Sequence, residues 1–534
     1  MTHPLLAQAA ADVSYWPLGI LAISVAFIFV SIIKLKLHPF LALIFAAILT
    51  GLLTGDLPGM STENVGLFKS RVALNDTPAD TGNDMLLAVN WSLLAFGNTA
   101  AGIGFVVALA AIIGVCMLGS GAADRVVRWL LSVFGEKRAG LVLLSSGFLL
   151  SIPVFFDTVF FLLIPLARAL SLRTGKSYTL FVMAMAGAGA ITHSMVPPTP
   201  GPLMIAEGLK LDLGIAMMAG LAASVLPAWL VLFLAKRFDR KFNLPMRDVP
   251  GASTSELKTI VDKKDSELPN LFLSALPIAL PVILISLVSI LNLVAKDSVS
   301  GAAWFRYLEF FGSPNIAMLL AALVAIYTLA AQTIREKRPM EGGLMSTLSK
   351  ALEDPLQTAG VIILITGAGG AFGGMIRLAG VGETIEAVAT SYNISLILLA
   401  WGATAVVRIA QGSATVAMIT GVGLMSAVIG DGSSLPYHPL YIFLAIGFGS
   451  ITLSWMNDSG FWVVQRLSGF TEKEMLKTWT VMLTAISVAG LLQVLVMAEV
   501  LPMKPVPAQK TSQVSSVPAL GSAALDGLRL HRRK

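Results

Sequence analysis

Charged residues are scarce in this sequence. Asp, Glu, Lys and Arg make up 13% of its 534 residues, whereas hydrophobic residues make up 56% and the mean hydropathy is +0.80. Soluble domains contain about 25% charged residues, so the composition excludes that class and predicts a polytopic membrane protein in contact with a lipid bilayer. Of the formal net charge of +6, about +5 lies after Leu501, so the basic residues do not indicate a nucleic-acid partner.

Cysteine and the common catalytic signatures are almost absent as well. The single cysteine, Cys116, excludes a disulfide framework. No His-Glu-x-x-His sequence occurs, and neither Ser194 nor Ser413 lies in a nucleophile-elbow motif, so we expect no catalytic residue, metal or cofactor. The first 15 residues contain no Lys or Arg, unlike a cleaved signal peptide, and Trp16–Ile33 is therefore expected to remain as the first membrane helix.

Hydrophobic runs that cross, or nearly cross, a hydrocarbon layer about 30 Å thick occur throughout the chain. They are Trp16–Ile33, Pro39–Thr54, Thr99–Leu118, Tyr178–Val196, Leu213–Ala235, Leu271–Leu293, Asn315–Ala331, Gln357–Leu378, Leu440–Met456 and Thr480–Met497. Two longer runs, Leu141–Leu170 and Ile394–Val428, contain a charged residue near their middle. We expect both to form re-entrant helical hairpins, because non-helical backbone at membrane depth is tolerated only where protein buries it or a cavity adjoins it.

An internal repeat relates the two halves of the chain. Residues 187–198 and 447–458 are identical at five of twelve positions, where composition alone predicts roughly one. Each copy begins as an apolar segment and then loses its helical character among hydroxyls, a His or carboxylate, and Pro or Asn. An apolar segment that breaks once in each half of a membrane protein is a pointer to a transporter's binding site.

The Lys and Arg residues predict the orientation of the repeats. The positive-inside rule places both the loop after the first span and the segment 236–268 in the cytoplasm, so the first half begins outside and the second half begins inside. The predicted fold class is an all-α polytopic membrane protein with two inverted-topology repeats, each with about five transmembrane helices plus a re-entrant hairpin and a broken helix. The predicted boundaries are 15–235 for the first repeat, 236–268 for a cytoplasmic linker, 269–500 for the second repeat and 501–534 for a disordered basic tail. The segment 236–268 fits a plain inter-helix loop equally well.

Two carboxylates lie in hydrophobic surroundings. Asp157 follows Ile-Pro-Val-Phe-Phe, and Asp458 follows Ser-Trp-Met-Asn. A charged residue at membrane depth costs at least ~2.5 kcal/mol, which favours a function as a proton site, cation site or ligand anchor over a structural hydrogen bond that pins the backbone. We predict that Asp157 and Asp458 are the proton-coupling residues.

The second broken region contains the sequence Arg408-Ile-Ala-Gln-Gly-Ser-Ala-Thr-Val. Gly412, Ser413 and Ala414 are small enough to let the backbone approach a ligand, and a helix that begins just after them would direct free N–H groups and its positive dipole end toward an anion. Gln411, Ser413 and Thr415 add uncharged groups suited to hydroxyls. Arg408 fits two roles equally well: it could pair with a substrate carboxylate or neutralise one of the two buried carboxylates.

These residues also carry a family resemblance. The motifs are Lys34-Leu-Lys-Leu-His-Pro-Phe, Phe155-Phe-Asp-Thr-Val-Phe, His193 with Pro197-Pro-Thr-Pro-Gly-Pro, Thr366-Gly-Ala-Gly-Gly-Ala-Phe-Gly, Arg408-Ile-Ala-Gln-Gly-Ser-Ala-Thr and Asn457-Asp-Ser-Gly-Phe-Trp. Over roughly residues 15–500 the sequence resembles the gluconate permease family, the GntP type of proton symporter. The resemblance implies import of gluconate or a related sugar acid or small hydroxycarboxylate across a bacterial cytoplasmic (inner) membrane, and the inverted-repeat, paired-hairpin fold of the ion transporter superfamily.

The residues and the resemblance together define a predicted substrate site. Its members are Thr192, His193, Ser194, Arg408, Gln411, Gly412, Ser413, Thr415, Asn457 and Ser459. For His193, a structural role in the core carries equal weight. The expected ligand is a small organic anion and the expected coupling ion is the proton. The sequence does not decide whether the protein forms a homo-oligomer. Thr199 departs from the family, whose members commonly carry a histidine there, and residues 57–84 are longer and more polar than the family pattern; both bear on the identity of the substrate.

Other transport classes fit the pattern less well. A passive channel does not need inverted repeats with paired breaks, which suit alternating access. The main alternative is a cation/proton exchanger of the same superfamily that uses Asp157 and Asp458 without an organic substrate.

Arg377, near a membrane boundary, is predicted to be an end-of-helix anchor.

Overall fold

The computed structural model describes residues 15–55, 57–58, 83–174, 177–247, 265–295, 302–337, 339–340, 342–381, 384, 395–429 and 435–503, and the regular elements among them are all helices. Most of the loop 57–84, half of the linker 236–268 and nearly all of the tail 501–534 lie outside the described residues, so the predictions for those segments stay predictions.

The helices follow one another along the chain in two series. Before the linker they are α2 (Trp16–Phe29), α3 (Pro39–Thr54), α5 (Asp84–Ser120), α6 (Ala122–Phe134), α7 (Ala139–Leu150), α8 (Phe156–Thr174), α9 (Tyr178–Met195), α10 (Pro200–Gly208), α11 (Leu213–Ala223) and α12 (Val225–Phe242). After the linker they are α14 (Leu271–Val294), α16 (Ala303–Gly312), α17 (Pro314–Arg335), α18 (Gly343–Leu378), α20 (Leu396–Gln411), α21 (Ala414–Ile429), α22 (Leu440–Gly449), α23 (Ser459–Ser468), α24 (Glu472–Met475) and α25 (Val481–Val500).

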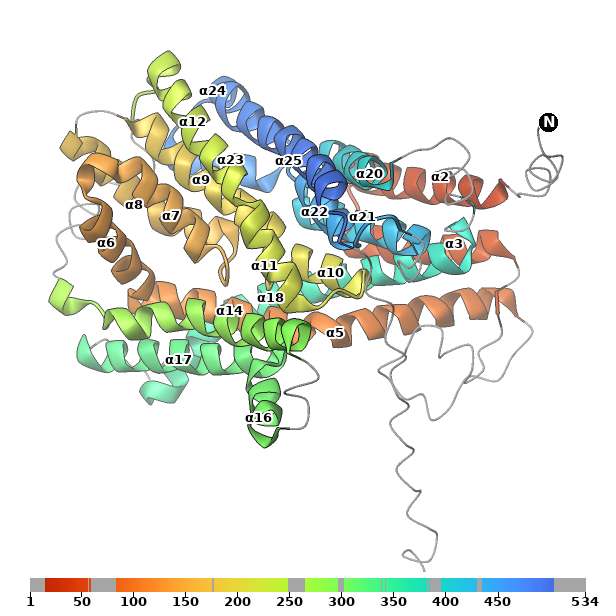
Figure 1. Cartoon of the computed structure of the whole chain (residues 1–534), viewed down its shortest axis with the longest axis horizontal. Helices are drawn as coiled ribbons and strands as arrows, with labels where there is room; N and C mark the ends of the chain where they lie inside the picture. Colours follow the sequence, from red (N-terminus) through yellow and green to blue (C-terminus); the bar gives the residue numbers. More distant parts are fainter. Residues whose placement is uncertain are drawn as a thin grey trace, which may run out of the picture.

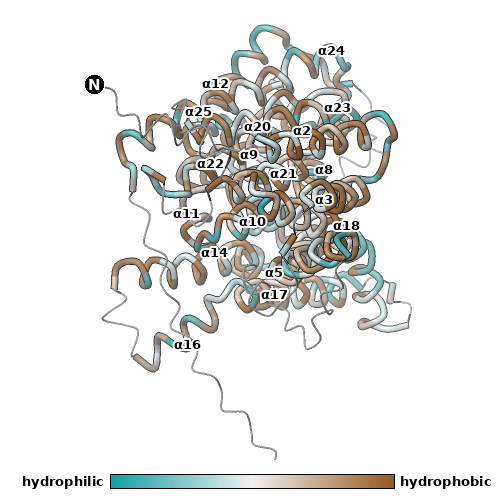
Figure 2. The backbone as a smooth tube through the Cα atoms, turned by 90° about the vertical axis from the view of Figure 1, so that its right-hand side faces the viewer, coloured by the Kyte–Doolittle hydropathy of each residue, from teal (hydrophilic) through white to brown (hydrophobic). Residues whose placement is uncertain are grey.

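Seven helical segments of the described chain are long and apolar enough to cross a membrane. They are Asp84–Ser120, Tyr178–Gly208, Leu213–Phe242, Leu271–Val294, Pro314–Arg335, Gly343–Leu378 and Glu472–Val500. Figure 2 shows hydrophobic residues running through the packed helices. The prediction of an all-helical, multi-pass membrane protein is therefore confirmed.

Two helices are much longer than the hydropathy pattern predicted. α5 begins at Asp84 rather than near Thr99, because the Asn83 side chain caps it by accepting a hydrogen bond from the backbone N–H of Met85 at 3.0 Å. α18 begins at Gly343 rather than near Gln357, and it continues through Pro355. The extra turns of α18 are largely polar and contain Pro355, which hid them from the hydropathy pattern, whereas the extra residues of α5, 84–98, are mostly apolar and extend the predicted hydrophobic run toward its N-terminus.

All four breaks that the sequence predicted occur in the structure. Residues 151–155 separate α7 from α8, and 196–199 separate α9 from α10; in the second series, 412–413 separate α20 from α21, and 450–458 separate α22 from α23. At Gly412 the backbone φ is +91°, which glycine adopts without strain. A Cβ at this position would lie only 2.1 Å from the carbonyl oxygen of Asn457, so the breaks 412–413 and 450–458 meet closely at this glycine.

The helices form two packed groups with α21 between them. In one group α5 packs along α18, with α3 and α17 alongside; in the other α9 packs against α7, α8 and α12, and α22 packs against α20 and α25. Figure 1 shows α5, α14 and α17 along the lower part of the view and α12, α24 and α25 at the top. Because α21 packs against α18 as well as against α20 and α22, it contacts both groups.

The two copies of the repeated segment touch each other in the interior. The first copy begins at the end of α9 and the second at the end of α22, and the glycines at the start of each copy are buried. A Cβ on Gly447 would lie 2.9 Å from the carbonyl oxygen of Ser194 and 2.6 Å from the sulfur of Met195. A side chain there would force the two broken helices apart, so the glycine permits the contact between the halves of the chain.

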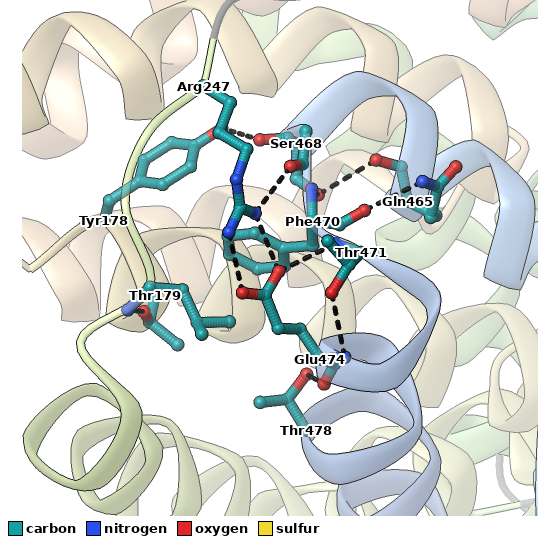
Figure 3. A network of polar contacts seen from close by, with 11 residues as sticks. Tyr178, Thr179, Arg247, Gln465, Ser468, Phe470, Thr471, Glu474 and Thr478 are labelled. Atoms are coloured by element: carbon teal, nitrogen blue, oxygen red, sulfur yellow. Dashed lines mark hydrogen bonds and ion pairs between the residues drawn. The ribbon is translucent and has the colours of Figure 1, made fainter.

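A network of polar contacts joins the two halves at one end of the molecule (Figure 3). Arg247, which follows α12, donates two hydrogen bonds to the Glu474 carboxylate at 2.7 and 2.8 Å and a third to the carbonyl oxygen of Gly469 at 2.9 Å. Hydrogen bonding to Glu474 raises the pKa of Arg247 above its ordinary value. The Tyr178 hydroxyl of α9 donates to the carbonyl oxygen of Ser468 at 2.8 Å. These contacts fasten the turn between α23 and α24 to α9 and the segment after α12.

Candidate functional site

A cavity of about 280 Å³, named here the Arg408 cavity, lies where several of the breaks converge. Its wall comes from α8, α9, α18, α20, α21, α23 and α25 and from the turns that precede α8, α21 and α23. The structure brings together eight of the residues that the sequence predicted for the site: Asp157, His193, Ser194, Arg408, Ser413, Thr415, Asp458 and Ser459.

Four other predicted residues do not line this cavity. Thr192 is fully buried on α9, where its hydroxyl donates to the carbonyl oxygen of Ala188. Gln411 lines a separate small crevice. Gly412 forms the break itself, and the Asn457 side chain donates to the carbonyl oxygen of Ile409 at 2.8 Å, so both residues shape the backbone around the cavity.

Three helices begin at the Arg408 cavity. α8 begins at Phe156, α21 at Ala414 and α23 at Ser459, and each of these residues or its neighbour lies in the cavity wall. The first N–H groups of a helix lack acceptors within the helix, and the helix dipole places partial positive charge there. These three helix ends direct partial positive charge into the cavity, and this contribution favours the binding of an anion.

Arg408 and Asp458 form a buried ion pair in the cavity wall. One terminal nitrogen of Arg408 lies 2.5 Å from Asp458 Oδ2, although the two residues are 50 positions apart in the chain. Asp458 also accepts hydrogen bonds from the Ser454 hydroxyl and from the backbone N–H of Gly460 at 2.9 Å, and the indole N–H of Trp479 donates to Ser454 Oγ at 2.7 Å. The Asp458 carboxylate therefore accepts hydrogen bonds from three donors.

The Arg408 guanidinium also has donor atoms that make no hydrogen bond among the described residues. Arg408 is only 3% exposed, and its Nε and Nη1 atoms are buried without a hydrogen-bond partner. A buried donor left unpaired costs about 1–3 kcal/mol. A carboxylate in the cavity would satisfy these two N–H groups, since an arginine presents its donors in a geometry that matches a carboxylate. Of the two roles that the sequence left open for Arg408, the structure shows the pairing with Asp458 and leaves room for the other.

Asp157 differs from Asp458 in having no recorded partner. Its side chain is exposed within the cavity, and no hydrogen bond or ion pair to its carboxylate occurs among the described residues. Neighbouring Phe156 is buried against Phe160 and Trp479, with ring centroids 6.1 and 5.8 Å apart. An ionisable group beside aromatic surfaces, open to the cavity and free of a counter-ion, is well placed to exchange a proton.

His193 and Thr199 lie on the two sides of the break after α9. His193 lines the cavity, and its Nδ1 atom is buried without a hydrogen-bond partner. The Thr199 hydroxyl lies 2.7 Å from the carbonyl oxygen of Val196 and 3.0 Å from that of His193. Thr199, which stands where the resemblance leads one to expect a histidine, thus stabilises the break instead of lining the cavity.

The structure adds residues that sequence reasoning missed. Thr158, Thr358, Ile362 and Trp479 also line the Arg408 cavity. The neighbour of Asp157 in sequence, Thr158, was the easiest of these to find, whereas Thr358 and Trp479 belong to helices of the second series with no local motif. Among the described residues, no group of three or more His, Cys, Asp or Glu side chains could hold a metal ion.

The sequence and the fold are similar to those of known transporters. A family model described as GntP family permease matches residues 83–500. A gluconate permease of Pseudomonas aeruginosa is 34% identical to the chain, covering 88% of it and 95% of the relative, and the Gnt-II system L-idonate transporter of Escherichia coli (strain K12) is 28% identical, covering 91% and 100%. The crystal structure of the Alcanivorax borkumensis YdaH transporter superposes with a TM-score of 0.57 at 14% identity, covering 88% of this chain and 100% of that one, which shows a shared fold.

Proposed function

Because the chain belongs to the GntP family of permeases, we propose that it imports gluconate or a related sugar acid by proton symport. The family is one of transporters and not of enzymes. The single observation that supports this substrate class concerns Arg408. Among the described residues, no acceptor pairs with its buried Nε and Nη1 atoms, and the residue lines the cavity at which three helices begin. Hydroxyl groups of Ser194, Ser413 and Ser459 in the same wall suit the hydroxyls of a sugar acid.

Charge balance supports coupling to a proton. With both carboxylates ionised, Arg408, Asp157 and Asp458 leave the cavity with a formal charge of −1, which opposes an anionic ligand. Protonation of Asp157 removes that charge, whereas Asp458 is already paired with Arg408. Proton binding and anion binding therefore favour each other, and by linkage the effect is reciprocal. We infer that Asp157 is the main proton carrier and that Asp458 orients Arg408.

Counterflow tests the proposed function directly. Purified protein in liposomes preloaded with unlabelled gluconate is expected to concentrate external labelled gluconate transiently, because exchange needs only the substrate site and no ion gradient. A panel of sugar acids, L-idonate included, in the external medium ranks the substrates by competition. A protein that moves protons in response to inorganic cations and shows no counterflow with any sugar acid would be a cation/proton exchanger, and the proposal would fall.

We also propose that the two series of helices are inverted repeats in a bacterial inner membrane. The support is the contact between the two copies of the repeated segment and the matching order of breaks in the two series. Lys34, which ends the first span, and Arg306 of α16, which follows the span α14, are both exposed. Inversion would place them on opposite sides of the membrane.

Cysteine labelling measures on which side of the membrane each of these two positions lies. In a Cys116→Ala background, Lys34→Cys is expected to react with an impermeant thiol reagent only after the cells are opened, and Arg306→Cys to react in intact spheroplasts. The Cys116→Ala protein, whose only cysteine is removed, is the blank. Labelling of both positions from one side would contradict the inverted arrangement while leaving the substrate proposal intact.

A further inference from the structure

A second and larger cavity, of about 470 Å³, lies between α5, α10, α18 and α21. It is named here the Arg377 cavity after the basic residue of α18 in its wall. Glycines of α18 and α21 form much of that wall, and at one point α18 and α21 approach so closely that a Cβ on Gly373 would lie 2.7 Å from the Cα of Gly423. The predicted role of Arg377 as a simple end-of-helix anchor does not account for its position in this cavity.

The two cavities follow each other along the same two helices. On α21, Thr415 lines the Arg408 cavity and Ile419 lines the Arg377 cavity, which are about 6 Å apart along the helix axis at 1.5 Å per residue. On α18, Ile362 lines the first and Gly369 the second, about 10 Å apart by the same measure. A solute that moved along α21 from one cavity would reach the other after a single turn.

The residues of α21 between Thr415 and Ile419 include buried apolar side chains. Val416 and Met418 are 3% and 0% exposed. Met418 packs onto α10 at Gly201, where a Cβ would lie 2.0 Å from the Met418 methyl carbon. Along α21, this Met418 turn is the partition between the residues that line the two cavities.

The chemistry of the Arg377 cavity suits a carboxylate that bears hydroxyls. The guanidinium of Arg377 makes no recorded hydrogen bond or ion pair among the described residues, and its Nε atom is buried without a partner. The formal charges of Lys210 and Glu207 in the wall cancel, so Arg377 gives the cavity a net formal charge of +1. The hydroxyls of Thr99 and Ser426 donate to backbone carbonyl oxygens at 3.0 and 3.1 Å, and their oxygens remain able to accept hydrogen bonds from ligand hydroxyls.

We propose that the Arg377 cavity is a second binding site for a hydroxycarboxylate anion, on the same path as the Arg408 cavity and separated from it by the Met418 turn. The proposal takes its ligand class from the proposed function. Arg377 binds the carboxylate, and Thr99 and Ser426 accept hydrogen bonds from hydroxyls. The chain then holds two anions at once, one on each side of the partition.

Equilibrium binding of labelled gluconate to the detergent-purified full chain tests the second site. Wild type is expected to bind two gluconates per chain at saturation, and Arg377→Gln is expected to bind one. Arg408→Gln is expected to retain one, held by Arg377. The matched control is Arg306→Gln, which removes the same charge from an exposed position on α16 outside both cavities and is expected to bind two.

The outcomes separate the two proposals. No saturable gluconate binding to wild type would overturn the proposed function. One gluconate per wild-type chain, with Arg377→Gln unchanged, would overturn the second site and leave the proposed function standing. If Arg377→Gln is not monodisperse in gel filtration, Ser426→Ala serves instead. This variant is expected to weaken one of the two binding steps, and an unchanged affinity in both steps would overturn the second site.

Discussion

Replacing Arg408 by glutamine is expected to raise the half-saturation concentration for gluconate counterflow by about 10- to 100-fold. The variant loses charge-assisted hydrogen bonds to the substrate carboxylate worth about 1.5–3 kcal/mol, and each 1.4 kcal/mol is a factor of ten in affinity. Ser413→Val is expected to act in the same direction with a smaller effect, since the Ser413 side chain, which accepts a weak hydrogen bond from the backbone N–H of Val416, also lines the cavity.

Removing Arg408 also leaves the Asp458 carboxylate buried without its counter-ion, and this second effect needs its own control. The double variant Arg408→Gln, Asp458→Asn removes both charges, so it reports the loss of substrate contact without an uncompensated carboxylate. It is expected to keep the raised half-saturation concentration and to recover expression. Arg466→Gln, an exposed change on α23, controls for the loss of a positive charge nearby. A double variant with wild-type half-saturation would move substrate recognition away from Arg408.

Replacing Asp157 by asparagine is expected to abolish accumulation of gluconate against its gradient while leaving counterflow intact. For one proton per substrate, a pH gradient of one unit stores 1.36 kcal/mol and supports about tenfold accumulation. The variant is expected to reach only equal concentrations on the two sides. Counterflow persists because exchange of labelled for unlabelled substrate requires no net movement of protons.

The pH dependence of gluconate binding tests the same role of Asp157, because the direction of the change in affinity can be predicted. In the wild type the proton on Asp157 removes a negative charge from the cavity, so gluconate affinity is expected to fall as the pH rises through the titration of that carboxyl. Asp157→Asn, permanently neutral, is expected to bind gluconate with little dependence on pH over the same range. Asp458→Asn is the comparison: it should lower affinity through Arg408 and keep the pH dependence. Uphill, pH-driven uptake by the Asp157→Asn protein would show that the carboxylate is structural, and Asp458 would then be the remaining carrier.

Much of the architecture follows from local properties of the sequence. Hydropathy is a sum over neighbouring residues, so the multi-pass class and the position of most apolar helices could be predicted. The breaks were predictable for the same reason, because proline, glycine and hydroxyl clusters act on the backbone where they occur. The break before α21 is an example, because the sequence predicted a helix that begins just after Ala414 and α21 begins at Ala414 itself.

The pairings at the site could not be predicted in this way. Arg408 contacts Asp458 across 50 positions, and Ser454 and Trp479 complete that network from two further segments. The residues next to Arg408 in the sequence could not decide between its two predicted roles, which were to pair with a substrate carboxylate or to neutralise a buried carboxylate. Only the tertiary contacts decide which carboxylate is neutralised, and they leave Asp157 as the carboxylate without a counter-ion.

Composition by itself determined that this is a multi-pass membrane protein, and the repeated segment indicated where its apolar helices break, because these properties depend on residues close together in the chain. The tertiary structure alone decided which side chains face the cavity. Thr192 and Ser194 lie two positions apart, and one points into the helix packing while the other lines the Arg408 cavity. A helix turns by about 100° per residue, so the direction of a side chain near a break depends on how the broken helices are packed against one another, and that packing is set by residues hundreds of positions away.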